Sequence, residues 1–156
     1  MASRVDRRPE TLVLAEFLPF RLNRLSEAVS RNLSEIYRVR CGLDIPDWRV
    51  LVTVGQRQGC TARYIAASSR MHKTRVSRAI ASLEQRALLE RSPNAADTRE
   101  LPLRLTKAGR KLYAALVPLA LERERALFSC LTGAQRNAFI EGLAHLENSL
   151  DLKSDE

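Results

Sequence analysis

The chain has 156 residues, of which 45% are hydrophobic and 28% are charged, and its formal net charge is +8 at pH 7. This balance predicts one compact domain with a buried core and excludes a disordered chain. No apolar stretch reaches the roughly 20 residues that a membrane helix needs, and the N-terminus lacks the apolar region of a secretory signal. We therefore expect a cytoplasmic protein with no membrane partner.

An apolar stripe near the N-terminus predicts a long helix within residues 11–41. Its members recur at intervals of three and four residues: Leu18, Leu22, Leu25, Val29, Leu33 and Ile36. A helix of this length is unusual in a small domain and often packs on a second copy of itself. Pro19 lies within the stretch, so the first turns form either a separate arm or a kinked segment.

A capping pattern predicts a second helix, from Ile45 to Arg57. Asp44 and Asp47 have the spacing of a capping box, and Pro46 is tolerated in a first helical turn. The apolar side chains of this helix are expected to face the core: Trp48, Leu51 and Val52.

Two further helices, at residues 61–68 and 72–87, are separated by a tight connection. Thr61 is a good N-cap for the first of them. On a helical wheel of the second, one narrow arc is apolar and is expected to be buried: Val76, Ile80, Leu83 and Ala87. The opposite and flanking positions carry hydroxyls, small residues and arginines: Thr74, Arg75, Ser77, Arg78, Ala81, Ser82 and Gln85.

The period then changes to that of strands, which predicts a β-hairpin over residues 88–105 with a polar tip. Leu101, Leu103 and Leu105 alternate with other residues in the returning strand. Pro102 cannot donate to a strand ladder, so we expect the hairpin at a sheet edge.

Two helices complete the chain, within residues 106–150. Thr106 should cap the first, which Pro118 should bend, and Thr132 with Gln135 has capping-box spacing before the second. The second carries an apolar stripe: Ala138, Phe139, Gly142, Leu143, Leu146 and Leu150. The fold is therefore expected to be mainly α with a small β-hairpin wing.

The positive charge is concentrated in the middle of the chain. Between Thr61 and Arg110, eleven lysines and arginines stand against four acids. This concentration favours a polyanionic partner, with nucleic acid first. The two helices at 61–68 and 72–87 have the order of a helix-turn-helix, in which the second helix enters the major groove.

The chemistry of the second helix suits a major groove, since arginine can bond guanine in a bidentate fork and short hydroxyls can meet phosphates or base edges. Arg99, at the hairpin tip, is a candidate minor-groove probe, with Asp97 as the carboxylate that orients it. The candidate DNA-contacting residues are Arg63, Lys73, Thr74, Arg75, Ser77, Arg78, Asp97 and Arg99.

No pattern indicates catalysis, a metal or a cofactor. His72 and His145 lie far apart in this arrangement, and the glycines form no phosphate-binding loop. The three cysteines, Cys41, Cys60 and Cys130, are interpreted as buried small hydrophobes in a reducing compartment. We therefore expect neither an enzyme nor a cofactor. A protein-interaction module and an RNA-binding module are alternatives, but arginines and hydroxyls on the exposed face and the scarcity of aromatic residues favour duplex DNA.

Three segments carry a family resemblance: "IPDWRVL", "TRVSRAIASLEQRALLER" and "DTRELPLRLTKAG". With them, nearly the whole chain resembles the multiple-antibiotic-resistance regulator (MarR) family of bacterial transcription factors. The family pattern of a wing Asp and Arg, then Leu-Thr and Gly, is matched by Asp97, Arg99, Leu105, Thr106 and Gly109. Two positions depart from it, because members often have Asp where this chain has His72 and a basic residue where it has Thr98. His72 is either a plain helix-start residue or a phosphate or ligand contact that gains charge near pH 6 to 7.

The resemblance implies a winged helix-turn-helix within an obligate homodimer. Residues 11–41 and 106–150 would form the dimerisation part, and residues 45–105 the DNA-binding lobe with its wing at 88–105. Such a dimer would repress transcription from a pseudo-palindromic operator. A small ligand would release it, although a regulator without any effector is an alternative.

"FLPFRLNRLSEAVSR" and "IPDWRVL" look like a subgroup associated with aromatic catabolism and, in some members, with acyl-CoA effectors. This resemblance implies that a small aromatic acid or its CoA thioester is the effector. Arg21, Arg24, Trp48 and Arg49 would line the pocket, and Arg38 and Arg40 would meet CoA phosphates.

Overall fold

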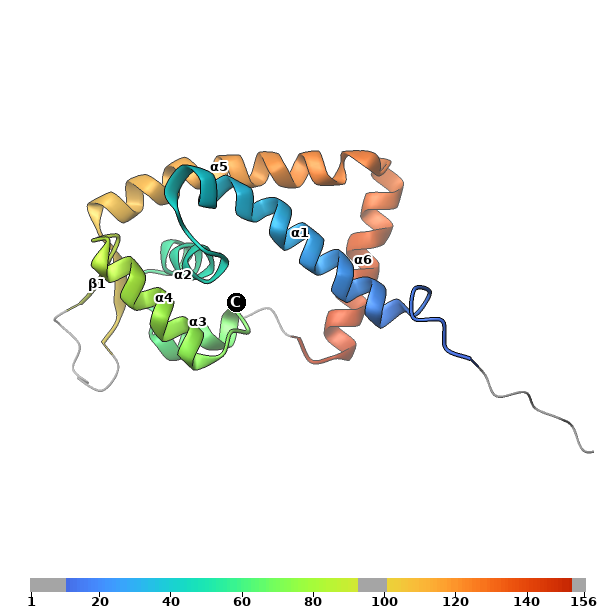
Figure 1. Cartoon of the computed structure of the whole chain (residues 1–156), viewed down its shortest axis with the longest axis horizontal. Helices are drawn as coiled ribbons and strands as arrows, with labels where there is room; N and C mark the ends of the chain where they lie inside the picture. Colours follow the sequence, from blue (N-terminus) through green and yellow to red (C-terminus); the bar gives the residue numbers. More distant parts are fainter. Residues whose placement is uncertain (1–10, 93–100, 153–156) are drawn as a thin grey trace, which may run out of the picture.

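The computed structural model describes residues 11–92 and 101–152 (Figure 1). In chain order the elements are α1 (Leu18–Cys41), α2 (Ile45–Gln56), α3 (Ala62–Ser68), α4 (Lys73–Gln85), β1 (Leu89–Arg91), β2 (Leu103–Leu105), α5 (Lys107–Leu127), a short 3-10 helix (Phe128–Cys130) and α6 (Gly133–Ser149). A lobe of α2, α3, α4 and the hairpin lies at one end. From it α1 and α5 extend side by side, and α6 turns back at their far end.

The first helix lies within the predicted residues 11–41 and contains the whole apolar stripe from Leu18 to Ile36. It begins at Leu18, and residues 11–17 lie outside it, with a turn at residues 14–16. Of the two alternatives for its start, the separate arm is the one that the structure has. Pro19 occupies the first turn of the helix, where a proline ring and its missing N–H are tolerated. The helix ends as expected at Gly42, whose φ of 60° is a left-handed conformation that glycine adopts readily.

The core of the lobe lies where α2, α3, α4 and the hairpin meet. Its largest fully buried side chains are Leu43, Leu51, Ile65, Leu83, Leu103, Leu105, Leu116, Val50, Val54 and Val76. Ala87 was expected on the buried arc of α4, but it is exposed and Ala79 is buried instead. The reason is that α4 ends at Gln85 and Ala87 takes a φ of 52°, which removes it from the helical wheel. Trp48 and Val52 are only partly buried.

The wing is a two-stranded antiparallel hairpin in which Leu89 pairs with Leu105 and Arg91 with Leu103. Leu103 also forms a bridge with Cys60, donating to its carbonyl oxygen over 2.9 Å. The described sheet has only the strands β1 and β2, so both are edge strands, as Pro102 predicted. Pro102 itself lies just before β2, and the bridge to Cys60 covers β2 at a single residue. The tip at residues 93–100, which includes Asp97, Thr98 and Arg99, lies outside the described residues.

The start of α5 is tied to the end of α4. The Thr106 hydroxyl accepts the Gly109 N–H at 3.0 Å and donates to the Ala87 carbonyl oxygen at 2.6 Å. A Cβ on Gly109 would overlap the Leu88 carbonyl oxygen. The sequence Leu-Thr followed by Gly therefore has a packing role at the base of the wing, because only glycine permits this approach.

The last helix contributes nothing to the core of the single chain. Its capping box is confirmed, since Thr132 N–H donates to the Gln135 side chain at 2.9 Å and Gln135 N–H donates back at 3.3 Å. No residue of α6 is buried, although the helix carries the expected apolar stripe. An uncovered apolar stripe of this kind is typical of an interaction surface.

Candidate nucleic-acid interface

The N-terminus of α4 is capped by His72. Its Nδ1 accepts a hydrogen bond from the Thr74 N–H at 3.3 Å, so this nitrogen carries no proton in the capped arrangement. Members of the family that this chain resembles often have Asp at this position, which is a good N-cap. In this chain His72 caps the helix in its place, with a weaker acceptor.

The face of α4 opposite the core is exposed, as predicted. The exposed side chains are Thr74, Arg75, Ser77 and Arg78, and they alternate with buried Val76, Ala79 and Ile80. Ser82 differs from its predicted flanking position, because its hydroxyl turns inward toward α2. The outward face of α4 therefore presents two hydroxyls and two guanidinium groups.

A basic hollow adjoins this face, between α3, α4 and β1. It has a volume of about 370 Å³, and its lining is Ala62, Arg63, Lys73, Val76, Ser77, Ile80 and Arg91. Two of the predicted cations, Arg63 and Lys73, are thus brought together with Ser77. Arg91 was not among the predicted contacts, although its place in the strand that directly follows α4 could have indicated it. Glu84 fixes the Arg91 guanidinium, with Nε and Oε1 2.8 Å apart.

Two cations of the mid-chain excess, and Arg57 just before it, have other partners. Arg86 donates to the carbonyl oxygens of Cys41 and Gly42, and Arg110 donates to that of Leu105 at 2.7 Å. The Arg57 guanidinium lies over the Tyr64 ring, 4.6 Å from its centroid. Tyr64 is therefore covered by a cation and half-buried, which is a poor platform for stacking an RNA base.

Asp47 links α2 to α4. Only 8% of this residue is exposed. Its Oδ2 accepts hydrogen bonds from the Ser82 hydroxyl at 3.3 Å and from the Asp44 N–H at 3.4 Å. Desolvation by burial raises the pKa of the Asp47 carboxyl, and the hydrogen bonds and nearby Arg86 counteract this only in part. The sequence indicated the capping role of Asp47 but not its contact with α4.

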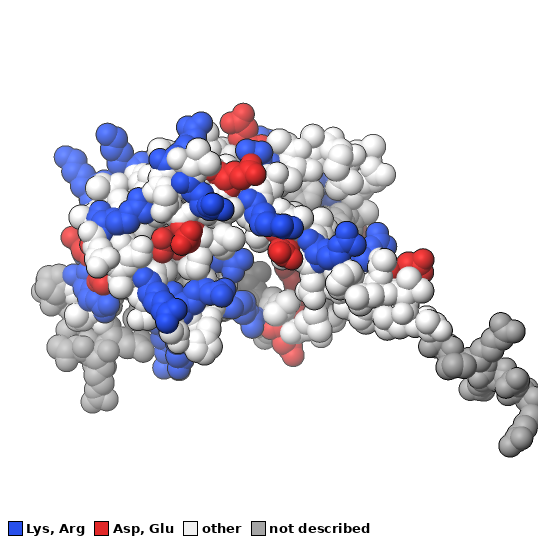
Figure 2. All heavy atoms as spheres, viewed as in Figure 1, with Lys and Arg blue, Asp and Glu red and all other residues white. Residues whose placement is uncertain are grey.

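Lysines and arginines outnumber acids on the half of the molecule that carries α3 and α4 (Figure 2). In the same view, the surface over the far end of α5 is almost free of charged groups. The positive charge is therefore dense around α3 and α4, as expected of a surface that meets a polyanion, although basic side chains also continue toward the other end of the molecule.

The residues predicted to bind an effector do not meet in one pocket. Arg21 and Arg24 lie at an open hollow of about 730 Å³ along the first half of α1, whereas Arg40 lies at a hollow between α1 and α5. Arg38 lies at a third, smaller hollow of about 290 Å³. Arg49 is exposed, and Trp48 stacks on Tyr37, with ring centroids 5.1 Å apart and planes 9° apart. Trp48 therefore has a packing role in this structure.

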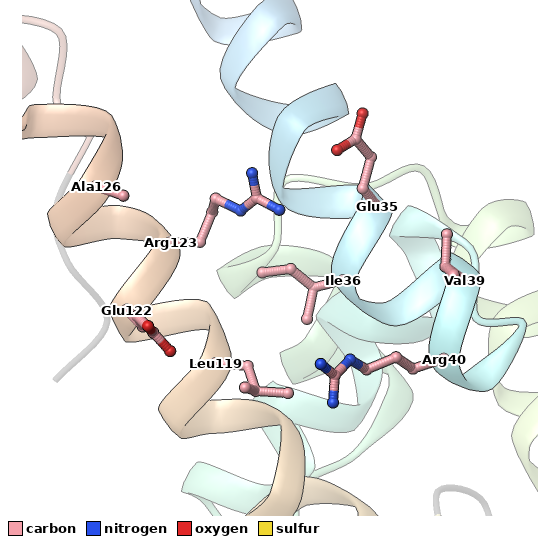
Figure 3. A pocket seen from close by; sticks show the side chains of 8 residues that line it. All are labelled: Glu35, Ile36, Val39, Arg40, Leu119, Glu122, Arg123 and Ala126. Carbon is pink, nitrogen blue, oxygen red and sulfur yellow. The ribbon is translucent and has the colours of Figure 1, made fainter.

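The hollow between α1 and α5 has a volume of about 550 Å³. Figure 3 shows Ile36 and Arg40 of α1 and Leu119 and Arg123 of α5 pointing toward one another across it. Apolar side chains thus lie between two guanidinium groups, a combination that suits an organic anion. The carboxylates of Glu35 and Glu122 also line the hollow, so it holds two cations and two acids. Arg123 was not predicted, because nothing in the sequence places α5 beside α1.

The cysteines differ in exposure, which corrects the expectation that all three are buried. Cys60 is buried, Cys41 is partly buried and Cys130 is exposed. Burial raises the pKa of the Cys60 thiol. Among the described residues, no group of three or more His, Cys, Asp or Glu side chains could hold a metal ion. No helix within residues 11–92 and 101–152 has both the length and the apolar character that crossing a membrane requires.

Comparison with known proteins gives two matches that bear on the family. The model of the MarR family matches residues 42–100. An uncharacterized HTH-type transcriptional regulator of Bacillus subtilis, YdcH, is 30% identical over 86 residues, which are 55% of this chain and 57% of that protein. The chain therefore matches little more than half the length of this curated relative.

Solved structures extend the similarity to the rest of the chain. Two that are less than 25% identical show the shared fold. A MarR-family regulator of Listeria monocytogenes complexed with 26mer DNA has 18% identity and a TM-score of 0.76, with 86% of this chain and 89% of that chain covered. CouR of Rhodococcus jostii bound to p-coumaroyl-CoA has 20% identity and a TM-score of 0.73, with coverages of 87% and 95%.

A MarR-family transcriptional regulator of Silicibacter pomeroyi, SPO1453, is 31% identical, with a TM-score of 0.73. The match covers 91% of this chain and 98% of that one, so it includes the helices on both sides of the winged lobe. With the family model matched across α2, α3 and α4, and with the fold shared from end to end, the chain belongs to the MarR family of winged helix-turn-helix transcription regulators.

Proposed function

We propose that the protein is a homodimer that binds duplex DNA sequence-specifically and represses transcription. The observation that carries the proposal is the outward face of α4, where Thr74, Arg75, Ser77 and Arg78 are exposed and no acid interrupts them. An α-helix fits the major groove, which is about 12 Å wide. The DNA complex of the Listeria relative supports the same use of the fold.

The position of a residue in the lobe suggests its role in DNA binding. Arg78 lies in the middle of α4, where its guanidinium group would form hydrogen bonds to a guanine. The hydroxyl groups of Thr74 and Ser77 would contact base edges or phosphates. Arg63, Lys73 and Arg91 surround the basic hollow and would hold backbone phosphates. In this proposal Arg99 enters the minor groove, with Asp97 orienting it.

The uncovered apolar surface supports the homodimer. Nearly all the exposed large hydrophobic residues fall in two segments, 12–25 and 139–152, and the exceptions are Val39 and Leu121. These segments belong to the N-terminal arm, the first half of α1 and α6, which together lie away from α4. A second copy of the chain offers the same apolar surface, as a two-fold interface requires. The residues 11–41 and 106–150 are thus proposed as the dimerisation part, and 45–105 as the DNA-binding lobe.

The DNA-binding proposal is tested by selecting binding sites from a random-sequence duplex library. We expect the selected sequences to contain an inverted repeat with half-site centres about one helical turn apart. Fluorescence anisotropy should then give tight binding to the selected duplex and weak binding to either of its single strands or to an RNA duplex of the same sequence. Equal binding to all four would support a non-specific polyanion-binding protein instead.

The hollow between α1 and α5 is the proposed effector site. Arg40 and Arg123 would hold a carboxylate or a CoA phosphate, while Ile36 and Leu119 contact the apolar part of the ligand. A small aromatic acid or its CoA thioester fits this description, and the p-coumaroyl-CoA complex of CouR supports the class. Occupancy would favour a dimer geometry that no longer matches the operator.

A panel of aromatic acids and their CoA thioesters, added to the protein–operator complex, tests the effector proposal. We expect at least one compound to release the DNA, and we expect Arg123→Gln to lose the response while it still binds the operator. Lys111→Gln, which removes an exposed charge elsewhere on α5, is the matched control. If Arg123→Gln responds like the wild type, the ligand binds at another place.

A further inference from the structure

The ends of α1 and α4 are joined by one side chain. Arg86, which follows the last residue of α4, donates from Nη1 to the Gly42 carbonyl oxygen at 3.3 Å and from Nη2 to that of Cys41. The last carbonyl groups of a helix have no partner within it and carry the negative end of its dipole. A guanidinium group at this end of α1 is therefore placed where a cation is favourable.

We propose that Arg86 is a positioning residue that sets the direction of α4 relative to α1, and that it couples the pocket between α1 and α5 to DNA binding. This inference rests on the proposed function, in which α1 belongs to the dimer contact and α4 reads DNA. A residue that joins the two fixes the separation and tilt of the two reading helices in the dimer.

The geometry of the contact favours a role in orientation. The planar fork of a guanidinium group can bond two adjacent carbonyl oxygens at once, so it restricts rotation as well as distance. Otherwise α1 and α4 each pack on α2. The link from Asp47 to Ser82 holds α2 to α4, but Arg86 alone among these polar links reaches the last residues of α1. Because Arg86 is exposed, its contribution to overall stability is expected to be small.

The same segment of α1 borders the proposed effector site. Arg40 lines the hollow between α1 and α5, and Cys41 and Gly42, the acceptors of Arg86, follow it directly. A ligand that moves the Arg40 side chain therefore acts on the turn whose carbonyl groups Arg86 holds. When this turn moves, the two hydrogen bonds of Arg86 move the end of α4 with it. The buried side chains of the core need not move.

The test compares wild-type protein with Arg86→Met and Arg86→Lys on a series of selected operators. In the series the half-sites are separated by the selected spacing, or by one or two base pairs more or fewer. Each added base pair moves one half-site by about 3.4 Å and rotates it by about 34°. Lys111→Met is the control for loss of one positive charge. Light scattering and thermal denaturation establish that every variant is a folded dimer.

We expect the wild type and Lys111→Met to lose about tenfold or more in affinity when the spacing changes by one base pair. We expect Arg86→Met to bind the operator of selected spacing about three- to tenfold more weakly and to discriminate less among spacings. We also expect it to lose most of the DNA release that the active aromatic acid or CoA thioester causes in the wild type. Arg86→Lys should lie between the two, since it restores the charge but not the fork.

Two outcomes overturn the inference. One is an Arg86→Met spacing profile parallel to that of the wild type, which would mean that the residue affects only the amount of active protein. The other is an unchanged ligand response in a variant that has lost its spacing preference, which would remove the coupling. Failure of the wild type to bind any selected duplex would instead contradict the proposed function itself. The measurement on the wild type alone distinguishes this outcome from the two that concern Arg86.

Discussion

The Ser82 hydroxyl of α4 donates a hydrogen bond to the buried carboxylate of Asp47 on α2, over 3.3 Å. The same carboxylate oxygen accepts the Asp44 N–H at the start of α2. One acidic side chain therefore caps a helix of the lobe and holds the proposed reading helix against it. A buried carboxylate with so few partners is costly to ionise, which makes the contact sensitive to pH.

We predict that Asp47→Asn becomes more stable relative to the wild type as the pH rises from about 4 to about 7. The pKa of Asp47 in the folded protein is raised above 3.8 by burial, so the folded state binds its proton more tightly than the unfolded chain does. The resulting stabilisation is present at pH values below 3.8 and is lost as the pH rises through the raised pKa. Asparagine cannot ionise and does not suffer this loss. Urea denaturation across the range measures the difference, and a difference that stays constant with pH would contradict the prediction.

Arg78 and Lys73 should have different effects on DNA binding. Arg78→Ala should cost about 1 to 3 kcal/mol on the selected operator and relax the preference at one base pair, because a base contact is lost. Lys73→Ala should weaken binding about equally on all sequences, because a phosphate contact is lost. It should also reduce the slope of log affinity against log salt concentration by about 1. Anisotropy titrations at several salt concentrations separate the two effects. Wild-type discrimination in Arg78→Ala would remove this residue from the base-reading set.

Gly109→Ala should destabilise the fold by about 1 to 3 kcal/mol, since the added Cβ would overlap the Leu88 carbonyl oxygen and push α5 from the base of the wing. Gly133→Ala is the matched control, because a Cβ there meets no atom within 4 Å. Its stability should stay within about 0.5 kcal/mol of the wild type. Thermal denaturation of both variants tests the assignment. Equal stability of the two would show that the approach of α5 to Leu88 is not tight.

The three thiols should differ in reactivity. Cys130 is exposed and should be alkylated first, whereas Cys60 is buried with a raised pKa and should react only after unfolding. Mass spectrometry after timed exposure to iodoacetamide gives the order, and Cys130→Ser should remove the fastest phase. Native-state labelling of Cys60 as fast as that of Cys130 would contradict the packing described for the hairpin.

Local patterns predicted the elements well, because capping residues and apolar periods act over a few positions. Asp44, Thr61, Thr106 and Thr132 each precede a helix as expected. One error arose at Ala87, where the backbone leaves the regular helical wheel. At Pro19 the sequence left a separate arm or a kinked segment open, and the structure has the separate arm.

Contacts between distant segments could not be predicted in this way. Arg86 was counted in the mid-chain charge excess that favoured a polyanionic partner, but its partners are the carbonyl groups at the end of α1. Arg123 joins Arg40 only because α5 lies beside α1. In both cases the sequence indicates the chemical type of a side chain, whereas its partner depends on the packing of helices that are far apart in the chain.

In the proposed function, two copies of α4, related by a two-fold axis, bind one duplex. Light scattering coupled to size exclusion, with the protein alone and then with its selected operator, gives the number of chains in each species. We expect a free protein of twice the single-chain mass of 17.6 kDa and a complex of two chains on one duplex. A free protein of single-chain mass that binds the operator as one chain per duplex would contradict this proposal.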